Sequence, residues 1–81
     1  MTRANIYALI DKERAAQDLR YPNRTQYKYS APHIVVLGGQ LAKLEADWYN
    51  NADRDTLLER FINIAAIAVR ALEEIEIIPN P

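Results

Sequence analysis

Residues 53–74 constrain the fold most strongly, because they form a helical pattern that is apolar on two faces. One face holds Leu57, Leu58, Phe61, Ala65, Ala68, Val69 and Leu72, and the second holds Ile64, Ile67 and Ala71. A helix that is apolar on both faces has to be buried on both faces. Two further helices from so short a chain cannot cover both faces, so the pattern predicts a homo-oligomer with this helix at its centre.

Two segments that precede it also carry helical signals. We expect one helix over about residues 2–20, capped by Thr2, and another from Ser30 to about residue 50, with Pro32 in its first turn. Asp53 is expected to cap the third helix. No segment alternates cleanly with period two, which argues against strands. The sequence therefore predicts an all-α fold, a three-helix bundle unit that forms one helical domain over residues 1–78, with a tail over residues 79–81.

The middle helix carries two features that bear on packing. Apolar residues recur at alternating spacings of three and four, which predicts a packing seam and places Trp48 in the core. The seam consists of Ile34, Leu37, Leu41, Leu44 and Trp48. Gly38 and Gly39 interrupt this helix, and each costs roughly 1 kcal/mol relative to Ala. The pair predicts either a close approach of another helix or a ligand against the backbone. After the third helix, residues 75–78 could form a short strand or an extended arm.

Composition excludes several classes of function. The 81 residues include no Cys and one His, so disulfides, thiol chemistry and structural zinc are not expected. No apolar stretch is long enough for a membrane span or a signal peptide, so we expect a cytoplasmic protein without a membrane partner. The net charge is −1, yet no acid occurs between Asp18 and Glu45. A local basic segment on a nearly neutral chain favours a small anionic ligand over duplex nucleic acid.

That basic segment includes a loop over residues 21–29, which is long for a connection between helices and is therefore a candidate for function. The loop and the residue before it supply Arg20, Tyr21, Arg24, Tyr27, Lys28 and Tyr29. Tyrosine rings can stack on nucleobases, and the cations can hold phosphates. The alternative is an exposed loop that its tyrosines anchor to the bundle.

Three motifs appear in a fixed order along the chain. They read E-R-x-x-Q-D over residues 13–18, V-L-G-G-Q-L-A-K over residues 36–43, and L-L-E-R-F-I-N-I-A-A-I-A-V-R-A-L-E over residues 57–73. Together they resemble the short phage and bacterial MazG-like proteins of the all-α nucleotide pyrophosphohydrolase superfamily. The resemblance implies a helical homo-oligomer that hydrolyses nucleoside triphosphates with Mg²⁺, which acidic motifs on two helices would hold.

The chain departs from that family at every metal-ligand position. In the alignment these positions hold Gly39, Gln40, Lys43, Arg60 and Asn63. Two carboxylates have become cations and two have become amides, so we expect no metal, no cofactor and no catalytic residue. A pocket of this kind could still hold phosphates through charged hydrogen bonds, which favours binding without turnover.

The candidate ligand-binding residues come from three sources. These are the aligned metal-ligand positions, the basic segment, and the face of the first helix that flanks the nucleotide site in the family. They are Arg14, Gln17, Arg20, Arg24, Tyr27, Lys28, His33, Gln40, Lys43, Arg60 and Asn63. The expected partners are a nucleotide or another phosphate-bearing small molecule, and a second copy of the chain through the third helix. A lone His33 without a serine or cysteine partner is not expected to be catalytic.

Three functions remain open. The first is a nucleotide-binding protein without turnover, for example a phage sponge that sequesters a nucleotide signal of host defence. The second is a working Mg²⁺-dependent pyrophosphohydrolase, whose carboxylates would have to come from Glu13, Asp18, Glu45 and Glu59. The third is a structural or inhibitory protein that binds another protein through its apolar faces.

Overall fold

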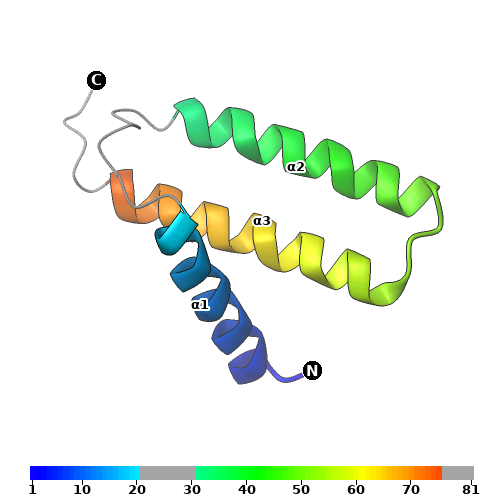
Figure 1. The fold of residues 1–81 in the computed structure, drawn as a ribbon, viewed down its shortest axis with the longest axis horizontal. Coiled ribbons are helices and arrows are strands. Elements are labelled where there is room, and N and C mark those ends of the chain that lie inside the picture. The colour runs from blue at the N-terminus through cyan, green and yellow to red at the C-terminus, as the bar shows by residue number, and fades with distance from the viewer. Residues whose placement is uncertain (21–30, 76–81) are drawn as a thin grey trace.

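A computed structural model describes residues 1–20 and 31–75 of the chain. It contains three helices, α1 (Arg3–Arg20), α2 (Ala31–Tyr49) and α3 (Arg54–Ile75). Both α1 and α2 pack on α3: α2 runs alongside α3 in the opposite direction, and α1 crosses it obliquely (Figure 1). Within those residues no strand occurs, so the expected all-α fold of three packed helices is confirmed. The loop over 21–29 and the segment 76–81 lie outside the described residues, as does the expected cap Ser30.

The helix starts follow the capping residues that the sequence contains. The Thr2 hydroxyl accepts a hydrogen bond from the backbone N–H of Asn5 at 3.2 Å, and α1 begins one residue after Thr2. The Asp53 carboxylate accepts one from the backbone N–H of Thr56 at 2.8 Å. Hydrogen bonding to Thr56 lowers the pKa of Asp53, since a negative charge is favoured at a helix N-terminus. Both caps are confirmed.

The turn between α2 and α3 is closed by a residue in the left-handed region. Asn51 has a φ of 57°. Its N–H donates to the carbonyl of Trp48 at 3.2 Å, and the N–H of Ala52 donates to that of Asp47 at 2.9 Å. These two bonds form a Schellman motif, which satisfies the last carbonyls of a helix. The tight turn brings α3 back along α2.

The interior of the described chain is mainly polar. Ala66 is its fully buried hydrophobic residue, whereas its buried polar and charged residues are Arg14, Gln17, His33, Arg70 and Glu74. Burial of such groups requires hydrogen-bonded partners. Hydrogen bonds between side chains therefore help to hold the three helices in this arrangement, together with half-buried apolar side chains such as Leu37 and Ile67.

Three of the five residues of the predicted apolar seam of α2 are exposed in the single chain, whereas Leu37 and Leu44 are half-buried. The prediction that Trp48 lies in the core is wrong. Trp48 is 70% exposed, Ile34 is 66% exposed and Leu41 is 53% exposed. Instead, α2 directs His33, Gln40 and Asp47 toward α3, where each has a polar partner. Periodicity identified a helix with an apolar stripe, but it could not show that the polar stripe would face the neighbouring helix.

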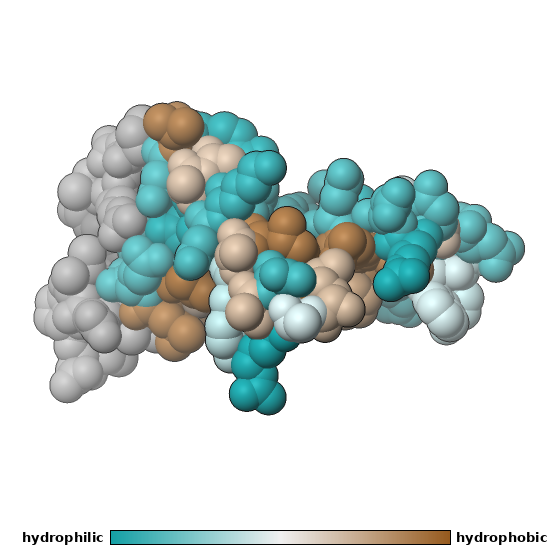
Figure 2. Space-filling view, turned by 90° about the horizontal axis from the view of Figure 1, so that it is seen from below, coloured by the Kyte–Doolittle hydropathy of each residue, from teal (hydrophilic) through white to brown (hydrophobic). Residues whose placement is uncertain are grey.

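Gly38 and Gly39 are not approached closely by another helix among the described residues, because a Cβ atom built on either would have none of their heavy atoms within 4 Å. The other alternative, a ligand against this backbone, stays a prediction. The apolar faces of α3 are likewise left partly uncovered, with Phe61 and Leu72 exposed. Figure 2 shows apolar side chains in the middle of one face of the molecule and others farther to the left, while the right end of this face is mainly hydrophilic. None of the helices in the described ranges is long and apolar enough to cross a membrane.

Candidate functional site

A cleft of about 230 Å³ lies where the three helices meet. Its lining residues are Gln17 and Arg20 from α1, His33, Val36 and Gln40 from α2, and Asn63, Ile67 and Arg70 from α3. The lining combines cations and carboxamides with two aliphatic side chains, and none of its described residues is a carboxylate. A pocket with these groups can recognise an anionic, hydrogen-bonding ligand.

A chain of carboxamide hydrogen bonds crosses the cleft and joins all three helices. Gln17 Nε2 donates to Asn63 Oδ1 at 3.1 Å, and Asn63 Nδ2 donates to Gln40 Oε1 at 3.1 Å. Gln40 Oε1 also accepts a bond from Arg60 Nη1 at 3.1 Å. These contacts fix the orientation of the amides. If the oxygen and nitrogen of Asn63 were exchanged, a donor would face the donor of Gln17 and an acceptor would face the acceptor of Gln40.

One end of this chain is incomplete. Gln17 is 4% exposed, and its Oε1 atom has no hydrogen-bond partner in the structure. A buried acceptor that lacks a partner costs about 1–3 kcal/mol. Because Gln17 lines the cleft, a ligand with an N–H group could supply the partner that the described residues do not.

A buried charged cluster lies beside the cleft. Arg70 Nε donates to Glu74 Oε1 at 3.0 Å, and Glu74 Oε2 pairs with Nε2 of His33. Burial alone would raise the pKa of Glu74, but its hydrogen bonds with His33 and Arg70 outweigh burial and lower the pKa. The carboxylate is therefore ionised near neutral pH. It links α2 to α3 through His33 and Arg70, which also line the cleft.

A second ion pair, in which the arginine is buried and its acidic partners are partly exposed, holds α1 on α3. Arg14 Nε donates to Glu73 Oε1 at 2.9 Å, and Arg14 Nη2 donates to Asp18 Oδ1 at 3.1 Å. Desolvation would lower the pKa of Arg14, but the bonds to Glu73 and Asp18 outweigh it and raise the pKa. Arg14 belongs to the predicted ligand set, and the structure shows it holding two acidic side chains beside the cleft.

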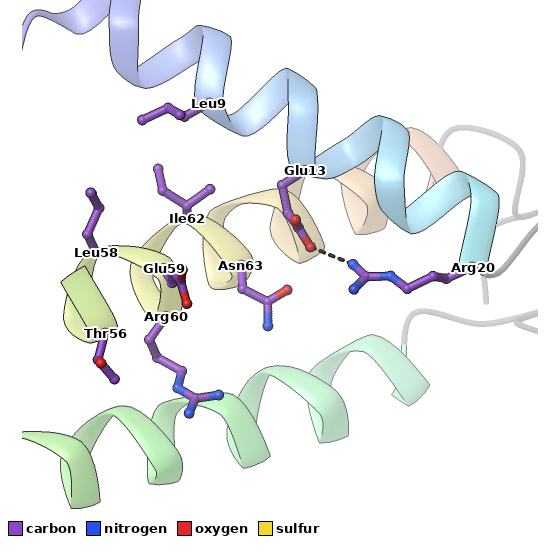
Figure 3. Close-up of a pocket in the computed structure, with 9 residues that line it drawn as sticks. All are labelled: Leu9, Glu13, Arg20, Thr56, Leu58, Glu59, Arg60, Ile62 and Asn63. Atoms are coloured by element: carbon purple, nitrogen blue, oxygen red, sulfur yellow. Dashed lines mark hydrogen bonds and ion pairs between the residues drawn. The ribbon is translucent and has the colours of Figure 1, made fainter. Parts of the chain in front are cut away.

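A second cavity of about 420 Å³ lies between α1 and the first half of α3 (Figure 3). Its lining residues are Leu9, Glu13, Arg20, Thr56, Leu58, Glu59, Arg60, Ile62 and Asn63. Arg20 Nη2 donates to Glu13 Oε1 at 2.6 Å across its edge, and Arg60 Nε donates to Asp47 Oδ2 at 3.0 Å. Arg20 and Asn63 line both cavities, so a ligand larger than the cleft could extend along them.

The structure brings many of the predicted ligand residues together. Five line the cleft, namely Gln17, Arg20, His33, Gln40 and Asn63. Arg60 lines the second cavity, where Asp47 and Gln40 already hold it. Lys43 is exposed on α2 and lines neither cavity. Arg24, Tyr27 and Lys28 lie outside the described residues.

Sequence reasoning missed two residues of this region, Arg70 and Glu74. Arg70 interrupts the most apolar stretch of the chain, and Glu74 lies one turn later on the same helix. A charge in an otherwise apolar helical run, with an opposite charge four residues away, was a usable signal for a buried ion pair.

The described residues contain no group of three or more His, Asp or Glu side chains that could hold a metal ion. Of the four carboxylates considered for a hydrolase, Glu13 pairs with Arg20 and Asp18 pairs with Arg14. Glu45 and Glu59 are exposed on different helices. The four do not form a common site for Mg²⁺ in this part of the chain.

Comparison with protein-family models, with curated proteins and with solved structures finds no match. Membership of the MazG-like superfamily therefore stays a prediction from the motifs. The functional argument rests on the cleft itself.

Proposed function

We propose that this protein binds a nucleotide, or a closely related phosphate-bearing small molecule, without converting it. The unpartnered Oε1 of Gln17 carries the proposal, since it is a buried acceptor on a residue of a cleft that is also lined by carboxamides, cations and two aliphatic side chains. The exocyclic amino group of a nucleobase is a donor of the required kind. Its hydrogen bond would remove the cost of the unsatisfied oxygen, about 1–3 kcal/mol.

The size of the cleft indicates which part of the ligand it holds. Its volume of about 230 Å³ is below the roughly 300–1,000 Å³ typical of pockets that enclose a drug-sized ligand. A base would occupy the cleft, and the phosphates would extend toward Arg20, which lines both cavities. The Arg20 side chain is half exposed and pairs with Glu13, a partner that it can exchange for a phosphate because exposed ion pairs are weak.

The groups around the cleft favour binding over chemistry. His33 is held by the buried Glu74, and among residues 1–20 and 31–75 the cleft lining contributes no carboxylate that could bind Mg²⁺ or activate water. A protein that binds a nucleotide and releases it unchanged acts as a sponge. If a phage encodes the chain, a nucleotide signal of host defence is the ligand that such a sponge would sequester. Self-association is a separate prediction, and none of the ligand contacts above requires it.

The test is a binding and recovery assay. The purified protein is incubated with a panel of linear and cyclic nucleotides, with and without Mg²⁺, then heat-denatured, and the released material is identified by chromatography. We expect one nucleotide to be depleted without Mg²⁺ and recovered intact. Recovery of a hydrolysed product would establish the pyrophosphohydrolase alternative, and depletion of none would favour the protein-binding alternative.

Two matched variants locate the site. Gln17→Met keeps the length of the side chain but removes the whole amide, that is the free acceptor and also the Nε2 donor to Asn63. It should weaken binding roughly 10-fold, the equivalent of about 1.4 kcal/mol. Lys43→Met is the control, because Lys43 lies outside both cavities. If Lys43→Met weakens binding and Gln17→Met does not, the ligand lies on the exposed side of α2 that carries Lys43, and the cleft is the wrong site.

A further inference from the structure

Arg60 lies at one end of the carboxamide chain that crosses the cleft. Its Nη1 donates to Gln40 Oε1 at 3.1 Å, and Asn63 Nδ2 donates to the same oxygen at 3.1 Å. Arg60 and Asn63 both extend from α3 toward α2 (Figure 3). At the other end of the chain, Gln17 Nε2 donates to Asn63 Oδ1 and leaves Gln17 Oε1 without a partner among the described residues. The atom that Gln17 can offer to a ligand therefore depends on the orientation of three amides.

The guanidinium group of Arg60 determines these orientations, because it only donates hydrogen bonds. The atom of Gln40 that faces Arg60 has to be the oxygen. The same oxygen faces Asn63, so Asn63 has to present its nitrogen to Gln40 and its oxygen to Gln17. Gln17 then has to donate through its nitrogen, and its oxygen is the atom that remains free.

The three amides alone do not select this direction. In the reversed chain, Gln40 would donate to Asn63 and Asn63 would donate to Gln17, with the same number of hydrogen bonds between amides. The free atom of Gln17 would then be its nitrogen, which is a donor. A hydrogen bond from a charged donor is strong enough to favour one of two such arrangements at least about 10-fold. Asp47 holds Arg60 in place for this bond, since its Oδ2 accepts from Arg60 Nε at 3.0 Å.

We propose that Arg60 is a positioning residue for base recognition, which acts through the amide chain to keep the oxygen of Gln17 free, so that the cleft selects nucleobases with an exocyclic amino group over bases with an oxo group at the same position. The amino group donates to this oxygen, whereas an oxo group would place one acceptor against another and leave both unpaired. Arg60 does not line the cleft, so its effect on the choice of base is indirect. The inference rests on the proposed function, in which a base occupies the cleft.

The first test compares pairs of probes that differ only in this group. Adenosine and inosine 5′-monophosphate form one pair, cytidine and uridine 5′-monophosphate form another, and isothermal titration calorimetry measures the binding of each. The wild-type protein should prefer the amino-bearing member of a pair by at least about 10-fold. In Arg60→Met both directions of the chain are populated, so the preference should fall to within about 2-fold. Because the two members carry the same phosphate, loss of the arginine charge affects both alike and does not change the ratio.

A rescue and a control separate positioning from a general effect of the substitution. In the double variant Arg60→Met, Gln40→Glu, the ionised carboxylate only accepts, so it again requires the nitrogen of Asn63 and should restore the preference. Arg54→Met removes the same charge from an exposed residue of α3 that lines neither cavity, and it should leave the preference unchanged. If Arg60→Met does not fold, Gln40→Met breaks the chain at the next residue and should abolish the preference in the same way. A preference that survives Arg60→Met, that the double variant does not regain, or that Arg54→Met also removes would overturn the proposal.

A measurement without ligand distinguishes this inference from the proposed function. Nitrogen-15 NMR follows the side-chain N–H of Gln17 that bonds to Asn63, and Arg60→Met should make this proton exchange with solvent about 5-fold faster. The factor follows because the reversed chain rises from at most about a tenth to about half of the population. Unchanged exchange would refute the role of Arg60 even if a nucleotide binds. If exchange accelerates and no probe of either pair binds, the proposed function and the base selection are both wrong, although Arg60 orients Gln17.

Discussion

Replacing Glu74 with Gln removes a buried carboxylate that joins α2 to α3. The Glu74 side chain is 1% exposed, and it accepts a bond from Arg70 and pairs with His33. Gln has nearly the same size and keeps some hydrogen bonding, so the variant tests the charge more than the packing. Arg70 and His33 would keep their buried positions without this counter-charge.

The structure sets the expected size of the effect. Removing one member of a buried ion pair costs about 3–5 kcal/mol. Because the Gln amide can still accept one hydrogen bond, the lower end applies, about 3 kcal/mol. A chain of this length has a free energy of unfolding of roughly 4–12 kcal/mol, so the variant should lose a quarter or more of it. With a urea dependence of about 1 kcal/mol/M, the unfolding midpoint should fall by about 3 M.

Urea unfolding followed by far-UV circular dichroism measures this midpoint, at one fixed protein concentration because association raises apparent stability. Glu59→Gln is the matched control, since it makes the same change at an exposed position of α3, where substitutions typically stay within about 0.5 kcal/mol. If Glu74→Gln behaves like Glu59→Gln, the buried charged cluster does not hold α2 on α3, and the reasoning about a polar interior is wrong.

Two further predictions follow from local features. Because the pKa of Glu74 is lowered from its usual 4.5 in the folded chain, its ionised form stabilises the fold above pH 4.5 and this contribution disappears as pH falls through the lowered pKa. The difference in urea midpoint between wild type and Glu74→Gln should therefore shrink between about pH 6 and about pH 3, and a difference that stays constant would refute the assignment. Asn51→Ala should destabilise the chain by about 1–2 kcal/mol, because Ala is disfavoured at a φ of 57°, whereas Asn51→Gly should not. Thermal unfolding of the two variants tests this, and equal losses would show that the left-handed turn is not the cause.

Some features of the site were readable from sequence and others were not. The motifs and the alignment selected Gln17, Gln40 and Asn63, and these three lie together in the cleft. Lys43 was selected on the same grounds, yet it is exposed and lines neither cavity. The difference is a matter of helix rotation: Gln40 and Lys43 are less than one turn apart, and only the packing of α2 decides which of them faces α3.

The sequence by itself determined the helices and their ends. Thr2, Asp53 and Asn51 act on backbone groups within a few residues of themselves, so their effect does not depend on the rest of the fold. The residue counts needed no structure either. With no Cys and one His in the sequence, disulfides, thiol chemistry and structural zinc were not expected. Local interactions of this kind are visible in any window of the sequence.

Only the tertiary structure decided which stripe of each helix is covered. The apolar stripe of α2 looked like a core seam, but Trp48 is exposed, and His33 and Gln40 are among the residues that pair with α3. Hydrophobic periodicity shows that a stripe requires burial, and it does not show whether the same chain or another one provides the cover. Polar partners such as His33 and Glu74 are 41 residues apart, and their pairing is a property of three-dimensional packing that no local pattern contains.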